Sequence, residues 1–303
     1  MSAYLGESAA LLTAVLWAFT TVFFTSASRR IGSFNVNMIR IPIALVIIAS
    51  TVLISTGRLF PEVSTAEQVY WLIASGVIGL VLGDTFLFRS LVILGPRLGT
   101  LIFGSWPIMT AVLSWIFLDE ILDLTAIAGI TVAFVGIGWV TSERKTEWVA
   151  KSTSADAGSK GFGVFLALLG GFGQATGLVM AKYAMGDDLA PIEASYIRMI
   201  AACATIWILG GITGKAATAI GAMRRLRPML YTLGGAICGP FLGIWMSLVA
   251  VKYTETGVAA AIMASVPVVV IPVTIIVYKQ KPSVRAILGA LVTTVGIALL
   301  FLR

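Results

Sequence analysis

Residues 101–120 read LIFGSWPIMTAVLSWIFLDE, a stretch almost wholly apolar and long enough to cross a bilayer as a helix. Pro107 stands near its centre and has no N–H, so the carbonyl of Phe103, four residues earlier, loses its helical partner. Hydrocarbon cannot satisfy that carbonyl. We therefore expect it to face protein or a water-filled cavity.

A proline in the middle of an apolar stretch also occurs in the second half of the chain. Residues 261–280 read AIMASVPVVVIPVTIIVYKQ, in which Pro267 frees the carbonyl of Met263. Pro107 and Pro267 are expected to kink their helices at matched depths. Two such helices, 160 residues apart, predict two halves that face each other across a shared cavity.

The composition excludes a soluble domain. Of the 303 residues, 58% are hydrophobic and 12% are charged, and the mean hydropathy is +0.99. A soluble protein of this size needs far more polar surface, so we expect a polytopic membrane protein. We attribute the net charge of +7 to loops that set membrane orientation rather than to nucleic-acid binding. No Lys or Arg precedes the first apolar run, so we expect no cleaved signal peptide.

Ten apolar segments predict an all-α fold with ten transmembrane helices. They cover residues 8–28, 35–56, 70–94, 97–118, 124–141, 161–184, 192–212, 228–252, 256–278 and 283–302. The polar stretch 143–160 predicts a linker between two five-helix repeats, at residues 1–142 and 161–303.

The two repeats are similar in sequence. Residues 82–137 align with 242–297 without a gap, with 13 of 56 positions identical, and the matches include Pro and Gly positions. Arg40 and Arg198 correspond at a spacing of 158 residues. Because each repeat has an odd number of spans, the second enters the membrane from the opposite side, which makes the repeats inverted. Inverted repeats with interrupted helices are typical of transporters, with the binding site between the repeats.

The distribution of positive charge predicts an orientation. Fifteen Lys and Arg residues fall in loops after odd-numbered spans, and four fall in even-numbered loops or at the C-terminus. The positive-inside rule therefore places the odd-numbered loops in the cytoplasm and both termini outside.

At this point the chain resembles the drug/metabolite transporter superfamily, and within it the ten-helix exporters of the EamA type. The resemblance rests on the two five-helix repeats, on Trp17 in the first segment (LLTAVLWAF), on the Trp106–Pro107 pair of the fourth and on the Val266–Pro267 pair of the ninth. The subgroup that it most resembles is that of the YddG-like amino-acid exporters.

The resemblance implies a basket of helices around a central cavity that closes alternately at either end. It also implies a multi-pass protein of the bacterial inner (plasma) membrane that exports amino acids or related metabolites without a cofactor. Relatives keep both termini in the cytoplasm, which conflicts with the charge bias. Small multidrug relatives carry a Glu in their first helix, whereas residues 15–20 here are VLWAFT, so this chain lacks that proton-coupling carboxylate.

Asp84 is the one carboxylate deep inside a predicted span, where its insertion costs roughly 2.5–3.5 kcal/mol. Such residues face the bundle interior and mark a transport pathway. We weigh a role in substrate binding or coupling against a structural ion pair with Arg40 or Arg89. Arg40 and Arg198 lie about a turn and a half inside their segments, which fits gates, carboxylate capture or snorkelling to the headgroups.

Aromatic and polar side chains within the spans are candidates for a cavity lining. Belt aromatics belong at the membrane interfaces, whereas Trp17, Trp106 and Trp245 lie far from the ends of their segments. Polar groups among apolar walls suit an amphipathic solute, although the same side chains can serve packing or bond to their own helix. The candidate lining is Trp17, Thr20, Asp84, Phe88, Trp106, Gln174, Trp245, Met263 and Ser265, with Phe172 as a further aromatic.

Small residues at four-residue spacing in the fifth and tenth segments, such as Gly129 and Ala133, predict close helix packing. A contact between two copies in a homodimer is the alternative to packing within a monomer. Cys203 and Cys238 lie inside apolar segments and are interpreted as packing residues.

No motif supports enzyme chemistry. The chain has no His, hence no Ser/His/Asp set and no HExxH zinc motif, and it has no phosphate-binding loop. We expect no metal and no cofactor. The leading hypothesis is a secondary transporter whose partners are a small-molecule substrate and the lipid bilayer. The alternatives are a multidrug or other metabolite carrier, for example of nucleotide sugars, and a channel or scramblase.

Overall fold

The structure is a computed structural model, and it describes residues 4–94, 96–141, 159–278 and 283–302. Within these residues all regular elements are helices. The predicted linker lies outside the described residues apart from Ser159 and Lys160. The Ser159 side chain accepts a hydrogen bond from the N–H of Phe162, so the next helix begins at Lys160, the last residue assigned to the linker.

The helices follow one order in both halves. In the first half they are α1 (Leu5–Ile31), α2 (Ser33–Thr56), α3 (Ala66–Ser75), the π-helix η1 (Gly76–Gly83), α4 (Asp84–Leu94), α5 (Pro96–Phe103), α6 (Trp106–Leu118) and α7 (Leu124–Thr141). In the second half they are α8 (Lys160–Met185), α9 (Pro191–Ile212), α10 (Ala216–Met223), α11 (Leu226–Ala236), the π-helix η2 (Ile237–Gly243), α12 (Ile244–Tyr253), α13 (Thr256–Met263), α14 (Val266–Tyr278) and α15 (Val284–Phe301). Only the short α10 lacks a counterpart among the described residues of the first half.

Local sequence signals set several helix ends. Gly32 between α1 and α2 has φ 83°, and Gly57 after α2 has φ 71°, a left-handed region that favours glycine. Thr65 caps α3 by accepting a hydrogen bond from the N–H of Gln68, whose own side chain accepts one from the N–H of Thr65. The chain therefore turns from α1 into α2 over a single residue.

Among the described residues, six helical runs are long and apolar enough to cross a membrane. They are Leu5–Ser28, Phe34–Thr56, Ala66–Leu91, Lys160–Met185, Pro191–Ile212 and Leu226–Tyr253. Four further apolar helices are shorter, namely Trp106–Leu118, Leu124–Val140, Thr256–Pro272 and Ile287–Phe301. The all-helical, multi-pass prediction is thereby confirmed, whereas ten crossings stay a prediction that depends on the four shorter helices.

The two proline-containing segments are interrupted in the same way. In the first half, α5 ends at Phe103 and α6 begins at Trp106. Pro107 therefore lies in the first turn of α6, where a missing N–H has no cost. In the second half the break falls between Met263 and Val266. Each predicted kink is thus a complete break between two helices.

The two breaks share their hydrogen bonds as well. The hydroxyl of Ser105 donates to the carbonyl of Ile102 at 2.8 Å, and that of Ser265 donates to the carbonyl of Ile262 at 2.7 Å. The carbonyl oxygen of Phe103 faces protein, as expected, because a Cβ atom on Gly171 of α8 would lie 3.3 Å from it. Matched geometry at matched positions indicates that the two halves are structural repeats.

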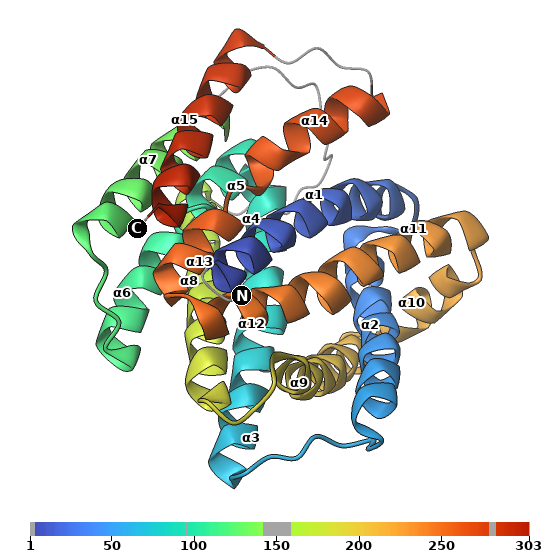
Figure 1. Cartoon of the computed structure of the whole chain (residues 1–303). Helices are drawn as coiled ribbons and strands as arrows, with labels where there is room; N and C mark the ends of the chain where they lie inside the picture. The colour runs from blue at the N-terminus through green and yellow to red at the C-terminus, as the bar shows by residue number, and fades with distance from the viewer. Residues whose placement is uncertain (1–3, 95, 142–158, 279–282, 303) are drawn as a thin grey trace.

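The first helix of each half packs mainly against the other half. α1 contacts α11, η2, α12, α13 and α14 of the second half, and α8 contacts α3, η1, α4, α5 and α6 of the first. α2 also pairs with α9, and α7 pairs with α15 (Figure 1). The two halves therefore exchange their first helices and form one helical body.

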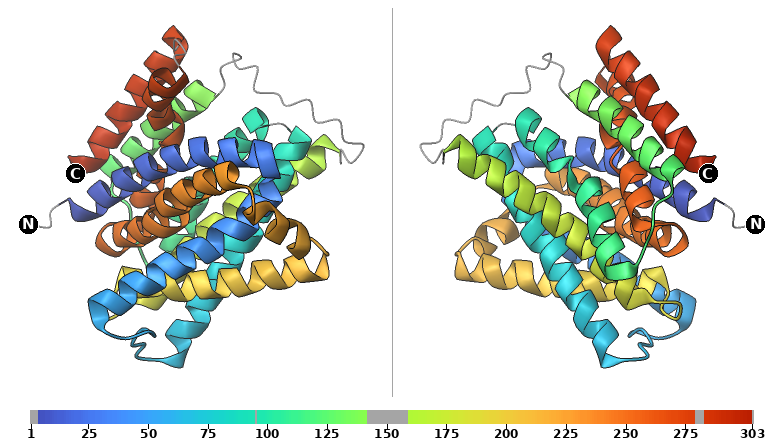
Figure 2. Two further views of the ribbon diagram at one scale, coloured as in Figure 1. Left: turned by 90° about the vertical axis from the view of Figure 1, so that its right-hand side faces the viewer. Right: turned by 90° about the vertical axis from the view of Figure 1, so that its left-hand side faces the viewer.

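Equivalent helices run in opposite directions. α1 leads away from the side where both chain termini lie, whereas α8 leads towards it; α2 then leads towards that side, whereas α9 leads away from it (Figure 2). Arg40 is the eighth residue of α2, and Arg198 is the eighth residue of α9. Because the two helices start from opposite sides, the two arginines lie at opposite depths of the molecule.

The α7–α15 pair is held by small residues. A Cβ atom on Gly296 would lie 2.3 Å from the backbone nitrogen of Ala133, and one on Gly289 would lie 3.1 Å from the carbonyl oxygen of Gly136. A Cβ atom on Gly129 would meet the side chain of Leu300 at 2.6 Å. The small residues predicted for packing thus bring two helices of the same chain into backbone contact.

Candidate functional site

A π-helix lies at the same place in each half, and several of the predicted site residues, such as Trp17, Thr20 and Asp84, lie beside these two elements. η1 ends at Gly83 and η2 ends at Gly243, 160 residues later, and each leads directly into an α-helix. π-helical turns are rare in proteins, and those that occur are often found at functional sites. These π-helices were not predicted from the sequence.

Helix α8 meets η1 through glycine on both sides. A Cβ atom on Gly177 would lie 2.8 Å from the Cα atom of Gly79, and one on Gly173 would lie 3.1 Å from the Cα atom of Gly83. The neighbouring atoms belong to the backbone, which cannot move aside as a flexible side chain can. We call these four residues the glycine seam, and the seam holds α8 and η1 at backbone contact.

The second half repeats the π-helix but not the seam. Where α1 crosses η2, a Cβ atom on Gly239 would lie 2.7 Å from Cγ2 of Thr20, and one on Gly243 would lie 2.5 Å from Nε1 of Trp17. Trp17 is partly buried and Thr20 is buried, with its hydroxyl donating to the carbonyl of Leu16 at 2.9 Å. Both predicted lining residues therefore cover η2 and separate it from the backbone of α1.

Asp84 and Arg40 form an ion pair beside η1. Asp84 is the first residue of α4, and its carboxylate binds the Nη2 atom of Arg40. The Nε atom of Arg40 donates to Oδ1 of Asn37 at 2.7 Å. Its guanidinium carbon lies 5.2 Å from the ring centre of Phe24 and 6.0 Å from that of Phe88. The side chains of Arg40 and Asp84 are only 13% and 22% exposed, so the pair is largely screened from solvent.

The ion pair shows which of the two candidate arginines, Arg40 or Arg89, is the partner of Asp84. The structure pairs Asp84 with Arg40, whereas the side chain of Arg89 is exposed one turn further along α4. The predicted aromatic Phe88 belongs to the surroundings of this pair. Asn37 and Phe24, which also contact Arg40, were missed because Asn37 stands near the start of its predicted segment and Phe24 is an ordinary apolar residue of a span.

Arg198 differs from Arg40 in having no counter-ion within the described part of the chain. The residue is 3% exposed, and its Nε and Nη1 atoms have no hydrogen-bond partner. Its Nη2 atom lies 3.5 Å from the point where a Cβ atom on Gly79 would stand. The guanidinium thus lies against η1, next to the glycine seam.

The remaining predicted lining residues divide by burial. Trp106, Met263 and Ser265 are buried in the packed core between the halves. Gln174 and Trp245 are partly buried, and Trp245 stacks at 6.0 Å on Phe241 of η2. Phe172 is 47% exposed and points away from the core.

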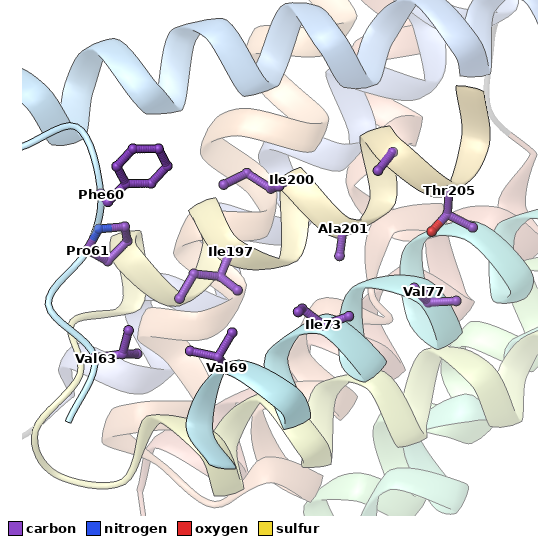
Figure 3. A pocket seen from close by; sticks show the side chains of 11 residues that line it. Phe60, Pro61, Val63, Val69, Ile73, Val77, Ile197, Ile200, Ala201 and Thr205 are labelled. Atoms are coloured by element: carbon purple, nitrogen blue, oxygen red, sulfur yellow. The ribbon is translucent and has the colours of Figure 1, made fainter. Parts of the chain in front are cut away.

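An apolar groove runs between α9 and the α3–η1 segment, with the connection from α2 to α3 at one end (Figure 3). Its volume is about 470 Å³. The lining residues are Phe60, Pro61, Val63, Val69, Ile73, Val77, Ile197, Ile200, Ala201, Ala204 and Thr205. The hydroxyl of Thr205 is the only side-chain polar group among them, so the groove suits hydrocarbon. None of the predicted lining residues borders it.

A polar cluster joins the two halves on the side of the termini. Glu120, after α6, accepts hydrogen bonds from the N–H and the hydroxyl of Thr256 at 2.7 and 2.9 Å, and lies 2.5 Å from Nζ of Lys182. Lys182 also donates to the carbonyl of Thr254 at 2.8 Å, and the hydroxyl of Thr254 donates to Glu7 at 2.9 Å. We call these five residues the termini-side latch. Its contacts connect α1 and α6 of the first half with α8 and α13 of the second.

A polar pocket of about 400 Å³ lies directly beside the latch. Glu120 and Lys182 belong to both, and the pocket is completed by Met185, Lys252 and neighbouring residues at the ends of α6 and α8. The latch gave no signal in the sequence, because its carboxylates stand at the ends of apolar runs like ordinary interface residues. The latch therefore lies on the termini side of the molecule, beside a small polar surface pocket.

The profile of the EamA-like transporter family matches the chain twice, at residues 4–142 and 161–302. A search of curated proteins finds no match. Among solved structures, one titled "Crystal structure of protein" is similar to this chain over 97% of each chain, with a TM-score of 0.76 and 16% sequence identity. At that identity the likeness extends to the fold alone.

Proposed function

Because the chain belongs to the EamA-like transporter family, whose members are membrane transporters of small metabolites, we propose that it exports amino acids or related metabolites by alternating access. The two repeats, residues 1–142 and 161–303, would form the two halves of the carrier. The observation that carries the proposal is the exchange of α1 and α8 between halves that run in opposite directions. Such an arrangement lets one packing be exchanged for the counterpart related to it by the pseudo-two-fold axis, which opens the other side.

Two polar contacts at opposite depths support the two gates that alternating access requires. The termini-side latch joins the halves where α8 ends and α13 begins. The Arg40–Asp84 pair lies nearer the opposite side, in the first third of α2. In our proposal, each gate opens while the other is closed, and the solute binds beside the π-helices between them.

Replacing Glu120 with glutamine is expected to loosen the termini-side gate. The variant loses the ion pair with Lys182, in which the two side chains are 11% and 23% exposed, at a cost of about 1–2 kcal/mol. Met185 is fully buried beside the latch, so a Met185→Cys probe reports opening. With Cys203 and Cys238 replaced by alanine, we expect Glu120→Gln to speed labelling by an impermeant maleimide at least fivefold.

The control for this experiment is Glu67→Gln, a change to an exposed carboxylate at the start of α3. Equal labelling rates in both variants would show that the latch is not a gate. Labelling of right-side-out and inverted vesicles also tells on which side the termini lie, which decides between the charge bias and the family pattern.

Transport itself is tested with the purified chain in proteoliposomes. Counterflow of labelled amino acids should be saturable and should be inhibited by unlabelled substrate. A panel of amino acids, cationic drugs and nucleotide sugars separates the exporter from the multidrug and nucleotide-sugar alternatives. If none of these solutes shows counterflow, the proposal fails.

One observation favours a different function. The apolar groove between α3 and α9 suits a lipid chain or a hydrophobic drug better than an amino acid. A scramblase would move fluorescent phospholipid between leaflets without saturation by soluble solutes. We therefore include a lipid-scrambling assay on the same proteoliposomes.

A further inference from the structure

We propose that Arg198 binds the negatively charged group of the transported solute, a carboxylate, beside η1. The inference rests on the proposed transport function and narrows its substrate to anions and zwitterions. It is carried by the burial of Arg198, by its missing counter-ion and by its comparison with Arg40.

The guanidinium of Arg198 is enclosed by protein. With the residue 3% exposed, its charge has lost nearly all contact with solvent, and the snorkelling interpretation does not fit. Within the described residues its Nε and Nη1 atoms donate to nothing. A buried charge is normally paired, because the ionised group loses its hydration without compensation. Arg198 therefore has two buried N–H donor groups, at Nε and Nη1, that lack an acceptor among the described residues.

The surroundings of the guanidinium consist largely of backbone. A Cβ atom on Gly79 would lie 3.5 Å from Nη2 of Arg198 and 3.7 Å from the carbonyl oxygen of Gly173, so Nη2 lies against the backbone of η1 and α8. Gly76 lies against the backbone of Arg198 itself, where a Cβ atom would come within 2.4 Å of the Arg198 carbonyl oxygen. Gly76 and Gly79 of η1 thus lie against the backbone and the guanidinium of Arg198, so a solute would reach the guanidinium only when the surrounding helices move apart.

The repeat supplies an internal comparison. Arg40 and Arg198 hold the eighth position of equivalent helices, and Arg40 is neutralised by Asp84, the first residue after η1. The equivalent first residue after η2 is Ile244, which has no charge. The second half therefore keeps the arginine but lacks the carboxylate that satisfies it in the first half.

A solute carboxylate has the shape and charge of the missing partner. Arginine presents a planar fork of donors that binds a carboxylate through two parallel hydrogen bonds. The Arg40–Asp84 pair shows that this molecule already holds an arginine–carboxylate contact between its helices, through Nη2 of Arg40. An anionic lipid headgroup could supply the same chemistry, so the test separates the two sources.

Thermal unfolding of the purified chain, in nanodiscs of phosphatidylcholine alone, tests the site. The probes are L-leucine, L-threonine and L-phenylalanine, each compared with its amide, which keeps the side chain and removes the negative charge. We expect at least one amino acid to raise the melting temperature by about 5 °C at 100 times its Kd, and its amide to give no shift. Arg198→Met should abolish the shift and should leave the ligand-free melting temperature equal or higher, because an unpaired buried charge is removed.

Two further variants make the result specific. Arg198→Lys keeps the charge but loses the fork, and should weaken carboxylate binding at least tenfold. Ile208→Met, at a 61% exposed position of the same helix, should bind as the unaltered protein does. If Arg198→Met melts several degrees lower and still responds to the amino acid, Arg198 is structural and the inference is overturned.

The remaining outcomes are also decisive. Stabilisation by nanodiscs that contain phosphatidylglycerol, with no response to any amino acid, would assign the site to a lipid headgroup and overturn the inference. Counterflow that is equal for an amino acid and its amide would overturn it while the transport function stands. Stabilisation by carboxylates without counterflow of any solute would leave the site in place and reject the transport function.

Discussion

Asp84→Asn is expected to lower transport at least thirtyfold while protein levels in the membrane change less than twofold. The substitution keeps the shape of the side chain and removes its charge, which leaves the guanidinium of Arg40 without its counter-ion. Breaking a fully buried pair costs about 3–5 kcal/mol, and we expect about 2–3 kcal/mol here because both side chains keep some exposure. This free-energy cost destabilises the conformational state of the carrier in which the Arg40–Asp84 ion pair is formed.

Initial rates of counterflow in proteoliposomes, normalised to reconstituted protein, measure the effect of Asp84→Asn. Asp123→Asn is the matched control, because it changes an exposed carboxylate whose cap on the N–H of Ala126 an asparagine can also supply. The double variant Arg40→Met/Asp84→Leu should regain stability without regaining transport. Flux at the unaltered rate in Asp84→Asn would make the pair a structural contact and nothing more.

Gly177→Val is expected to prevent the halves from docking. Its Cβ atom would lie 2.8 Å from the Cα atom of Gly79 and 3.1 Å from both the nitrogen of Gly79 and the carbonyl oxygen of Ser75, all of them backbone atoms. Relief requires that α8 and η1 move apart as rigid elements. We expect a loss of about 3 kcal/mol or more, at the upper end for overpacked sites.

The measurement for Gly177→Val is the monodisperse fraction after detergent extraction, together with the melting temperature of that fraction. Gly211→Val is the control, since a Cβ atom on Gly211 of α9 meets nothing within 4 Å. It changes the same residue type in the same way, inside another membrane helix. Equal behaviour of the two variants would contradict the glycine seam.

The fold class could be predicted because its signals are local. A proline without an N–H favours a helix interruption, so Pro107 and Pro267 marked both breaks and their common register, whereas Pro42 and Pro272 lie inside continuous helices. The continuous apolar runs of about 20 residues likewise indicated helices, which satisfy their backbone hydrogen bonds within one segment. The sequence could not show that the helix is fully interrupted at each of the two sites. At each break a serine hydroxyl, of Ser105 or Ser265, donates to a carbonyl three residues earlier, and the sequence does not determine whether that hydrogen bond forms.

The site could be predicted less well because its contacts join distant segments. The charge of Asp84 predicted a partner, but the choice between Arg40 and Arg89 depends on how α2 lies against α4. The partners of Glu120 in the latch are 62 and 136 residues away, and no periodicity in the sequence connects them. The π-helices depend on tertiary contact with α8 and α1, so propensity does not indicate them.

The exchange of first helices sets an order of events during synthesis. Helix α1 ends at Ile31, whereas α11, the first of its main partners, begins at Leu226, 195 residues later. At a ribosomal rate of about 5–20 residues per second, roughly 10–40 s pass between the synthesis of α1 and that of α11. During that interval the residues that Glu7, Trp17 and Thr20 contact in the finished fold, namely Thr254, Gly243 and Gly239, have not been made. The first helix therefore reaches its final packing only after most of the chain has been synthesised.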